Sequence, residues 1–391
     1  MLLASHAQNR HRYMQVKKLM FSLSPNTFKR CLGLSLAGLM AGGSWAGRPA
    51  AAQTVSSFCE SQEASTDMVQ GRSYGDPHIN TFDGFHYGFQ TVGEFILTHS
   101  SDRTFEVQTR QAAVPDRKNL SLNTAVAMRV CDQRVAFYVQ DAPDGGRNLV
   151  WVDGEPVEVG EAIALENGGE IQRQDERHYT VIWPSGDQVA IKEITVSGSR
   201  FLNIMPMVSR ARMNEMAGLL GNFNGNPEDD LTSRGGETMP ARSTYSIATN
   251  ALGRALPAAI PVYELETAYF EQLNQQFGDS WRINQAESLF DYPVGMTTAN
   301  FTDRSFPEQF LTLNGVSDED LEAAIAECEA AGVSEEMMDG CVFDVAATGN
   351  SGFANAAVNA VTAVVIERAT DRVIDEIQRN IPIPGGFGFP F

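Results

Sequence analysis

The sequence is poor in basic residues, histidine and cysteine, and each shortage excludes a class of protein. It has 29 Lys and Arg against 49 Asp and Glu in 391 residues, which gives a formal net charge of −20. A chain this acidic repels phosphate backbones and anionic lipid, so we expect no nucleic-acid partner. Its six histidines and five cysteines form no HExxH motif and no clustered Cys/His set, so we predict no zinc site. Cations are the partners that this charge favours.

Acidic residues are absent from residues 1–52, which hold seven basic residues. Lys29 and Arg30 precede an apolar run over 31–43, and Ala50–Ala52 supply the small residues of a secretory cleavage site. A membrane anchor is the alternative, but the run is shorter than the roughly 20 residues that span a bilayer. We therefore predict a cleaved signal peptide and no membrane span in the mature chain. The protein is then secreted or extracellular, with the cell surface and the periplasm also open.

Removal of the signal peptide takes away Cys31 and leaves four cysteines. An even number of cysteines in an oxidising compartment favours two disulfides. Cys328 and Cys341 would close a short loop and both lie in helix-like sequence, so we predict that they pair. Pairing of Cys59 with Cys131 then follows only by elimination.

The region from Glu94 to Val208 is rich in β-branched and aromatic residues, and turn signals such as Asp153-Gly154 interrupt it at short intervals. Short strands at this spacing predict a β-sandwich or a barrel. The expected strands are 95–97, 105–107, 125–130, 135–139, 150–152, 179–183, 189–194 and 201–204.

After about residue 240 the apolar residues follow a helical period. One helix is expected over 262–273, a second begins at Ser317, where Asp320 completes a weak capping box, and a third covers roughly 353–378. The predicted organisation is a signal peptide over 1–52, a linker over 53–71, a β-domain over 72–240, a mixed extension over 241–316, a small helical module with two cysteines over 317–380 and an irregular tail over 381–391.

Two short segments carry candidate chemistry, residues 75–97 and residues 218–231. Calcium takes six to eight oxygen ligands from carboxylates, amide side chains and backbone carbonyls, and the second segment offers that mixture. The spacing is not that of an EF-hand, and a polar turn without an ion is the alternative that composition leaves open. The potential donors of this segment are Asn222, Asn224, Asn226, Asp229 and Asp230.

Together the two segments resemble the von Willebrand factor type D domain. GDPH, TFDG and GNFNG occur in order at residues 75–78, 81–84 and 221–225, and FGDSW at 277–281 is similar to the family's closing motif. The resemblance covers about residues 72–283 and implies an antiparallel β-sandwich with one structural calcium ion. It also implies the calcium ligands, which are the side chains of Asp83, Asn222, Asn224 and Asp230, completed by Asp229 and the Asn226 carbonyl.

The chain departs from animal members of this family at two positions, where Ala217 and Leu220 replace cysteines. Covalent multimers are therefore not expected, and the chain resembles the cysteine-poor bacterial proteins that carry this domain. Residues 341–350, CVFDVAATGN, resemble a reduced form of the family's downstream helical module. The resemblance implies a calcium-stabilised extracellular interaction, adhesion or matrix protein without enzymatic activity, whose protein or glycan ligand the sequence does not identify.

The GDPH motif supplies an alternative function, because some relatives cleave themselves between its Asp and its Pro. The bond in this chain is Asp76–Pro77. The Asp76 carboxylate could attack its own carbonyl carbon, the proline nitrogen could leave, and His78 could supply a proton. A turn that leads into the first strand is the simpler interpretation.

A hydrolase is the remaining enzyme class to consider, because residues 71–75 fit the pattern GxSxG. That motif needs a strand before it and a helix after it, and neither is expected here, since Pro77 follows directly. We therefore predict no hydrolase site.

Overall fold

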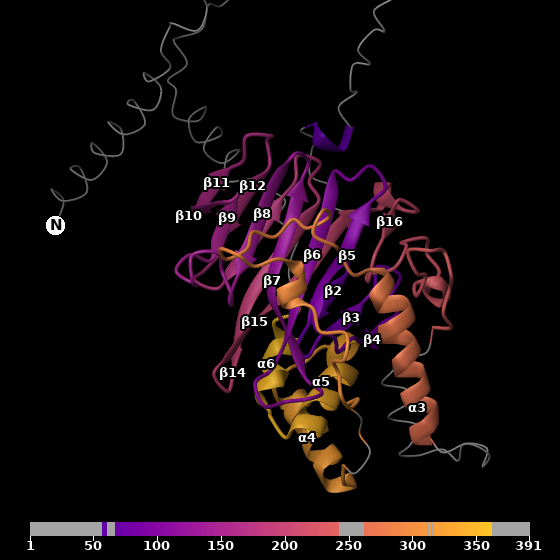
Figure 1. Cartoon of the computed structure of the whole chain (residues 1–391). Coiled ribbons are helices and arrows are strands. Elements are labelled where there is room, and N and C mark those ends of the chain that lie inside the picture. The colour runs from indigo at the N-terminus through magenta and orange to yellow at the C-terminus, as the bar shows by residue number, and fades with distance from the viewer. Residues whose placement is uncertain (1–56, 61–66, 242–261, 312, 314–315, 362–391) are drawn as a thin grey trace, which may run out of the picture. The chain divides into compact units, whose positions relative to one another are not determined.

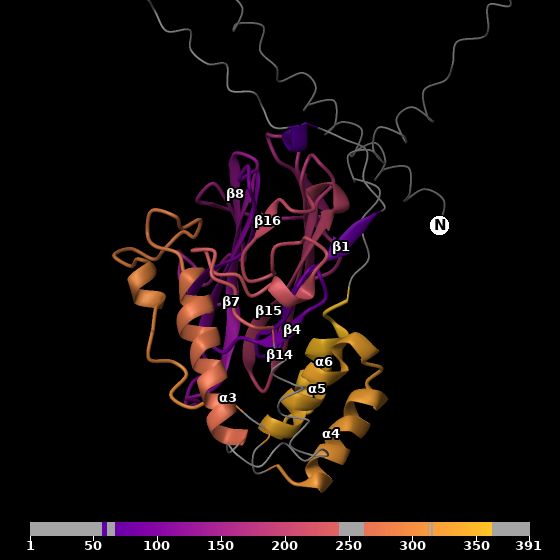
Figure 2. The same ribbon diagram turned by 90° about the vertical axis from the view of Figure 1, so that its right-hand side faces the viewer.

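The computed structural model describes residues 57–60, 67–241, 262–311, 313 and 316–361, all within one compact unit, Thr54–Phe391 (Figure 1). The predicted signal peptide, the tail over 381–391 and most of the predicted third helix lie outside the described residues. Two antiparallel sheets form the body of this unit, and three short helices lie together at one end of the sheets (Figures 1 and 2).

The larger sheet has the strand order β11-β12-β13-β14-β15-β2-β3-β4, and β1 also pairs with β15. All of these pairs are antiparallel, and β14 with β15 forms the longest hairpin, from Gln188 opposite Met207 to Val196 opposite Ser199. The strands are β1 (Met68–Gln70), β2 (Arg72–Tyr74), β3 (His78–Asn80), β4 (His86–Gly88), β11 (Ala162–Ala164), β12 (Glu170–Arg173), β13 (His178–Ile182), β14 (Gln188–Val196) and β15 (Ser199–Ser209).

The smaller sheet has the order β10-β9-β8-β7-β6-β5-β16, and it is antiparallel throughout. Register shifts interrupt the β5–β6 and β6–β7 pairs, which is typical of β-bulges. The strands are β5 (Gly93–Ser100), β6 (Phe105–Ala113), β7 (Ser121–Val130), β8 (Gln133–Tyr138), β9 (Val150–Val152), β10 (Glu155–Val157) and β16 (Met216–Ala217).

The two sheets pack face to face over one apolar core. Ring centroids of Phe105 on β6 and Trp183 after β13 lie 4.5 Å apart, and those of Phe137 on β8 and Tyr179 on β13 lie 5.4 Å apart. The predicted antiparallel β-sandwich is therefore confirmed. Each of the eight predicted strands lies, to within one residue at its ends, inside an observed strand. These observed strands are β5 to β9 and β13 to β15.

The strands that the sequence did not reveal are mostly short. β1 lies inside the predicted linker, where Met68–Gln70 pairs with Met207–Ser209 of β15, so the linker assignment is wrong for these three residues. A strand of three residues shows no clear alternation, and its partner lies far along the chain. β2 and β3 were missed for a related reason, because they hold polar residues that are nevertheless buried.

The predicted mixed extension covers one edge of the smaller sheet. α3 (Val262–Glu271) is followed by a π-helix, η5 (Gln272–Gly278), and the FGDSW motif then runs along β5. Ile96 N donates to the Trp281 carbonyl at 2.9 Å, and Ile283 N donates to the Glu94 carbonyl at 3.0 Å. The last helical element of the extension is the 3₁₀ turn η6 (Thr298–Phe301).

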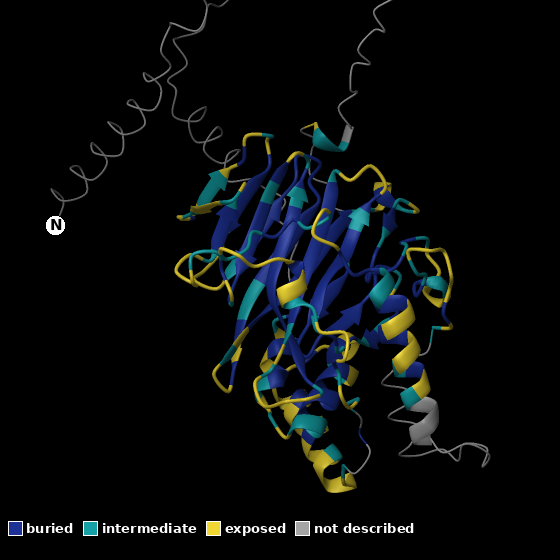
Figure 3. Ribbon diagram, viewed as in Figure 1, coloured by how far each residue is buried: buried dark blue, intermediate teal, exposed yellow. Residues whose placement is uncertain are grey.

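The helical module consists of α4 (Asp318–Ala330), α5 (Glu335–Thr348) and α6 (Gly352–Val358). Ser317 caps α4 as predicted, because its hydroxyl accepts the Asp320 N–H at 3.1 Å. Much of the outer side of α4 is exposed, whereas the inner sides of the helices pack on the larger sheet around Tyr74 and Phe201 (Figure 3). Of the predicted third helix, only the part up to residue 361 lies among the described residues, and there α6 begins at Gly352. It ends at Val358, and Arg72 Nε donates to the Ala360 carbonyl at 3.0 Å just beyond that end.

Both predicted cysteine pairs form disulfides in the structure. Cys328 of α4 is bonded to Cys341 of α5, with Cα atoms 6.1 Å apart. Cys59, in the 3₁₀ turn η2 (Ser57–Cys59), is bonded to Cys131 at the end of β7, with Cα atoms 5.8 Å apart. The second bond ties the segment before the GDPH motif to the smaller sheet.

Candidate functional site

The six residues that the sequence assigns to calcium lie together in the structure. Asp83 sits in the turn between β3 and β4, and the other five belong to the loop after β16, which contains the 3₁₀ turn η4 (Pro227–Asp229). The two carboxylate oxygens of Asp83 accept the Asn224 and Gly225 N–H groups, each at 2.9 Å. One side chain thus joins the two ends of the β-domain sequence.

The amide and carboxylate side chains of the loop lie within hydrogen-bond distance of one another. The Asn222 and Asn224 amides donate to Asp229 Oδ1 at 2.9 and 3.1 Å. Asp230 is buried, and its two oxygens accept the Asn222 N–H at 3.2 Å and the Thr81 hydroxyl at 2.6 Å. Asn226 is different, because its side chain caps η4 by accepting the Glu228 N–H, which leaves its carbonyl as the predicted donor.

Negative charge is in excess at this loop. Burial and the nearby charge of Asp83 outweigh the Thr81 hydrogen bond and raise the pKa of Asp230 to about 7. Hydrogen bonds from Asn222 and Asn224 lower the pKa of Asp229 instead. Within the described residues none of the three carboxylates forms an ion pair with Lys or Arg. A set of carboxylate and amide oxygens without a basic partner fits a hard cation such as Ca²⁺.

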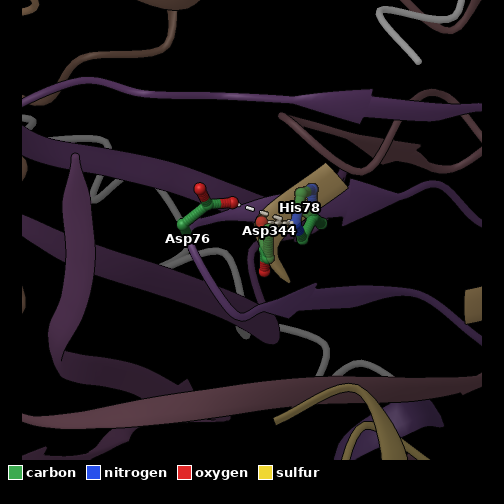
Figure 4. Close-up of side chains that lie close together, drawn as sticks. All are labelled: Asp76, His78 and Asp344. Carbon is green, nitrogen blue, oxygen red and sulfur yellow. Dashed lines mark hydrogen bonds and ion pairs between the residues drawn. The ribbon is translucent and has the colours of Figure 1, made fainter. Parts of the chain in front are cut away.

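The GDPH motif forms a second cluster, which is buried. Gly75 begins the turn between β2 and β3 with a φ of +61°, and Asp76 and His78 have exposed fractions of 0% and 1%. Asp344 of α5 enters this cluster from the helical module (Figure 4). The His78 Nε2 atom lies 2.5 Å from Asp344 Oδ1 and 2.9 Å from Asp76 Oδ1. One imidazole therefore faces two carboxyl groups.

The charges of this cluster stabilise one another. Burial alone would lower the pKa of His78, but the charges of Asp344 and Asp76 outweigh burial and raise it to about 10. Burial and the charge of Asp76 raise the pKa of Asp344 well above its usual value. His78 is therefore an imidazolium at neutral pH.

These side chains are the one group of three His, Cys, Asp or Glu residues, among the described residues, whose potential ligand atoms all lie within 4.8 Å of one another. Two ligands on a tetrahedral zinc ion, each bonded at about 2.0–2.1 Å, lie about 3.3 Å apart. The separations of 2.5 and 2.9 Å between His78 and its carboxylates are instead those of hydrogen bonds and ion pairs. The geometry is that of a proton-sharing cluster.

The peptide bond that follows Asp76 has a polar environment suited to reaction. Gln90 Nε2 donates to the Asp76 carbonyl oxygen at 2.7 Å. Both Asp76 carboxylate oxygens are buried, and His78 Nε2 lies 2.9 Å from Oδ1. A cavity of about 20 Å³ adjoins the cluster and is lined by Asp76, His78, Gln90 and Asn274 together with apolar side chains. This volume accommodates one water molecule.

Sequence reasoning found Asp76, Pro77 and His78 but missed Gln90 and Asp344. Gln90 carries no local signal, because it is an ordinary polar residue in a loop. Asp344 does carry one, because it is the single charged residue in the run from Cys341 to Thr348 and is only 1% exposed. A carboxylate on an apolar helix face needs a partner, and His78 is that partner.

The fold and the two clusters define a β-sandwich domain with a polar oxygen-rich loop and a buried GDPH turn. Residues 71–237 match the family model of the von Willebrand factor type D domain. This region of the chain is therefore similar to the von Willebrand factor type D domain, as the motifs predicted.

Curated relatives carry the similarity beyond the domain. Human Sushi domain-containing protein 2 is 26% identical over 296 residues, which are 71% of this chain and 30% of that protein. Human mucin-4 is 26% identical over 195 residues, 44% of this chain and 3% of that protein. Mouse alpha-tectorin is 26% identical over 210 residues, 49% of this chain and 8% of that protein. The chain thus spans less than a third of the length of these relatives. The resemblance to bacterial members stays a prediction.

Proposed function

We propose that this chain is a calcium-stabilised extracellular interaction, adhesion or matrix protein built on its von Willebrand factor type D domain. The mucins and the tectorin among its relatives support an extracellular setting, and so do two disulfides in the described residues. No described helix combines the length and the apolar character needed to cross a membrane. Because Cys59, Cys131, Cys328 and Cys341 are all paired within the chain, we do not propose covalent multimers.

The observation that carries the calcium proposal is the convergence of oxygen donors from two distant segments. Asp83 comes from the turn between β3 and β4, and the loop over 222–230 comes from the far end of the domain. Asp83, Asn222, Asn224 and Asp230 would hold the ion through side chains, with Asp229 and the Asn226 carbonyl completing the shell. Bound calcium neutralises the excess carboxylate charge and fixes the two segments to each other. Binding of a protein or glycan ligand would use other surfaces.

Thermal unfolding of the full chain tests this proposal, in millimolar Ca²⁺ and again in excess chelator. A ligand of the native state at a hundred times its Kd adds about 2.7 kcal/mol to the free energy of unfolding. The midpoint should therefore rise with calcium in the wild-type chain and in Glu228→Ala, which removes an exposed carboxylate of the same loop outside the ligand set. Asp83→Ala should abolish the rise. An equal response of both variants would contradict the assignment.

Self-cleavage at Asp76–Pro77 is a second candidate function, and specific observations favour it. The Asp76 carboxylate is buried beside His78, and Gln90 donates to the carbonyl oxygen of the bond that would break. A donor at that oxygen stabilises the negative charge of a tetrahedral intermediate. His78 lies beside the carboxylate as an imidazolium and can supply a proton.

The disulfide between Cys59 and Cys131 decides how cleavage must be measured. It joins a residue before the scissile bond to one after it, so the two products stay linked until they are reduced. On reducing gels we expect a fragment that begins at Pro77. Without reductant the intact mass of the chain should rise by that of one water molecule only. Asp76→Ala should show neither change. Hydroxylamine should trap the cyclic anhydride as a hydroxamate at Asp76. A wild-type chain that stays intact after reduction would exclude this function.

A further inference from the structure

The helical module reaches the GDPH turn through one ionisable side chain, that of Asp344 on α5. Its carboxylate lies 2.5 Å from His78 Nε2, and both side chains are buried. Two glycines allow this close approach. A Cβ atom on Gly340 would lie 2.7 Å from the Tyr74 hydroxyl, and one on Gly75 would lie 2.8 Å from the Asp344 carboxylate. The helix and the turn therefore fit together closely at the cluster.

The Asp76 carboxylate has an unusual environment within this cluster. It is fully buried, and His78 Nε2 lies 2.9 Å from its Oδ1 atom. That donor is shared with the nearer carboxylate, that of Asp344, at 2.5 Å. A buried carboxylate with only a share in one donor is poorly solvated, and poor solvation makes it a stronger nucleophile.

We propose that Asp344 is a positioning residue for self-cleavage at Asp76–Pro77. Its carboxylate shares the His78 N–H with that of Asp76, so Asp76 receives only part of this hydrogen bond and stays reactive. The inference rests on the self-cleavage proposed above. It makes the reactivity of a turn in the β-domain depend on the docked helical module, which lies more than 250 residues further along the chain.

The cleavage then proceeds in two balanced steps. An Asp76 carboxylate oxygen bonds to the carbonyl carbon of the same residue, the C–N bond to Pro77 breaks, and the proline nitrogen takes a proton from His78. Gln90 stabilises the charge that develops on the carbonyl oxygen. A water molecule, for which the adjoining cavity has room, then opens the cyclic anhydride into two carboxyl groups and returns a proton to His78.

The pH dependence of the cleavage rate distinguishes an effect of Asp344 on His78 from an effect of Asp344 on folding. The carboxyl groups of Asp76 and Asp344 face His78, the Tyr74 ring lies 5.2 Å from its ring, and His86 on β4 is close enough to respond to its charge. Removing the charge of Asp344 leaves the imidazolium with one carboxylate. It then loses its proton at lower pH, and the alkaline limit of cleavage moves down with it.

The test compares Asp344→Asn with Asp339→Asn in the full chain. Asp339 lies on the same helix and is exposed, so its variant makes the same chemical change away from the cluster. Initial rates are measured on reducing gels across a range of pH, and thermal unfolding checks the fold of each variant. We expect Asp344→Asn to be cleaved about ten to a hundred times more slowly, the worth of one hydrogen bond to a charged group. Asp344→Glu keeps the carboxylate and should restore part of the rate.

The possible outcomes distinguish this inference from self-cleavage itself. Equal rates and pH profiles in Asp344→Asn and Asp339→Asn would overturn the role of Asp344 and leave self-cleavage standing. Faster cleavage in Asp344→Asn would also overturn it, because α5 would then restrain the reaction. A fall in rate without a shift of the alkaline limit, unrelieved by Asp344→Glu, would mean that Asp344 matters only for folding. A wild-type chain that is never cleaved would overturn both proposals.

Discussion

The calcium loop and the GDPH cluster are both groups of carboxylates, but they balance their charge in opposite ways. The loop gathers the half-buried Asp83 and Asp229 with the buried Asp230, and it has no basic partner among the described residues. The GDPH cluster lies in the interior and contains its own cation, His78, between two carboxyl groups. A carboxylate cluster near the surface can leave its excess charge to an ion from solution, whereas an interior cluster needs an internal base.

This difference predicts different sensitivities for the two sites. The stability that the loop provides should depend on the calcium concentration, because the neutralising charge comes from solution. The stability that the GDPH cluster provides should depend instead on docking of α5, because one of its two carboxylates belongs to the helical module. Each of the following experiments changes one site and leaves the other as a reference.

The largest effect is expected from Asp344→Ala. Removing one partner from a buried ion cluster leaves the remaining charges poorly compensated and costs about 3–5 kcal/mol. The free energy of unfolding, measured with urea, should fall by about that amount both with and without calcium. Asp339→Ala, on the exposed side of the same helix, should cost less than about 0.5 kcal/mol. A cost for Asp344→Ala that disappears in calcium would mean that the two sites are coupled.

The pH dependence should separate the sites in one experiment. In calcium-free protein the pKa of Asp230 is raised from 3.8 to about 7, so the folded state binds more protons than the unfolded state between these values and stability falls as pH rises through that window. The pKa of His78 is raised from 6.5 to about 10, so its contribution is complete below 6.5 and is lost as pH rises through 10.

Calcium provides the control for these two windows. Bound calcium keeps Asp230 ionised in the folded state, so the part of the loss between about pH 4 and 7 that Asp230 contributes should disappear in millimolar Ca²⁺. The part that comes from the raised pKa of Asp344 should remain. The loss between about pH 6.5 and 10 should remain. Urea unfolding at a series of pH values measures both, and calcium dependence of the higher window would contradict the division of charge between the sites.

The two sites also differ in how far the sequence predicts them. The calcium loop could be predicted because five of its six candidate ligands lie within nine residues and each is of a type that binds calcium. Asp83 could be added only through the family motif TFDG. For the GDPH cluster, the sequence indicates the turn but not Asp344 or Gln90, because tertiary packing alone brings these residues to it.

The same division between local and long-range information applies to the fold. Long strands and the helices at 262 and 317 are evident from period and composition. β1, β2 and β3 are not, because they are three residues long and are held by pairing with β15 and with one another. The end of α6 at Val358 belongs with them, since Arg72 from β2 binds the Ala360 carbonyl just beyond it.

Gly221→Ala should remove the effect of calcium. A Cβ atom at this position would lie 2.1 Å from Asp230 Oδ1, and its φ of +80° disfavours any side chain. The Asp230 carboxylate must move, so we expect the stabilisation of about 2.7 kcal/mol by saturating calcium to be lost. Gly236→Ala is the control, because Gly236 has a similar φ of +86° and no atom within 4 Å of the added Cβ. It should introduce the same backbone strain as Gly221→Ala without a steric clash. If Gly221→Ala keeps the calcium response, Asp230 is not a ligand.

The smallest effect is expected from Thr81→Val, which removes a hydroxyl and keeps the shape of the side chain. The Thr81 hydroxyl donates to Asp230 Oδ2 at 2.6 Å, and this bond lowers the pKa of Asp230. Its loss should cost about 1–2 kcal/mol at pH 8, where Asp230 is ionised, and less at pH 5, where the carboxyl keeps its proton. The calcium-free Asp230 pKa, measured by NMR titration, should rise in the variant. An equal cost at both pH values would show that the hydroxyl contributes through packing, and the charge of Asp230 would then play no part in the bond.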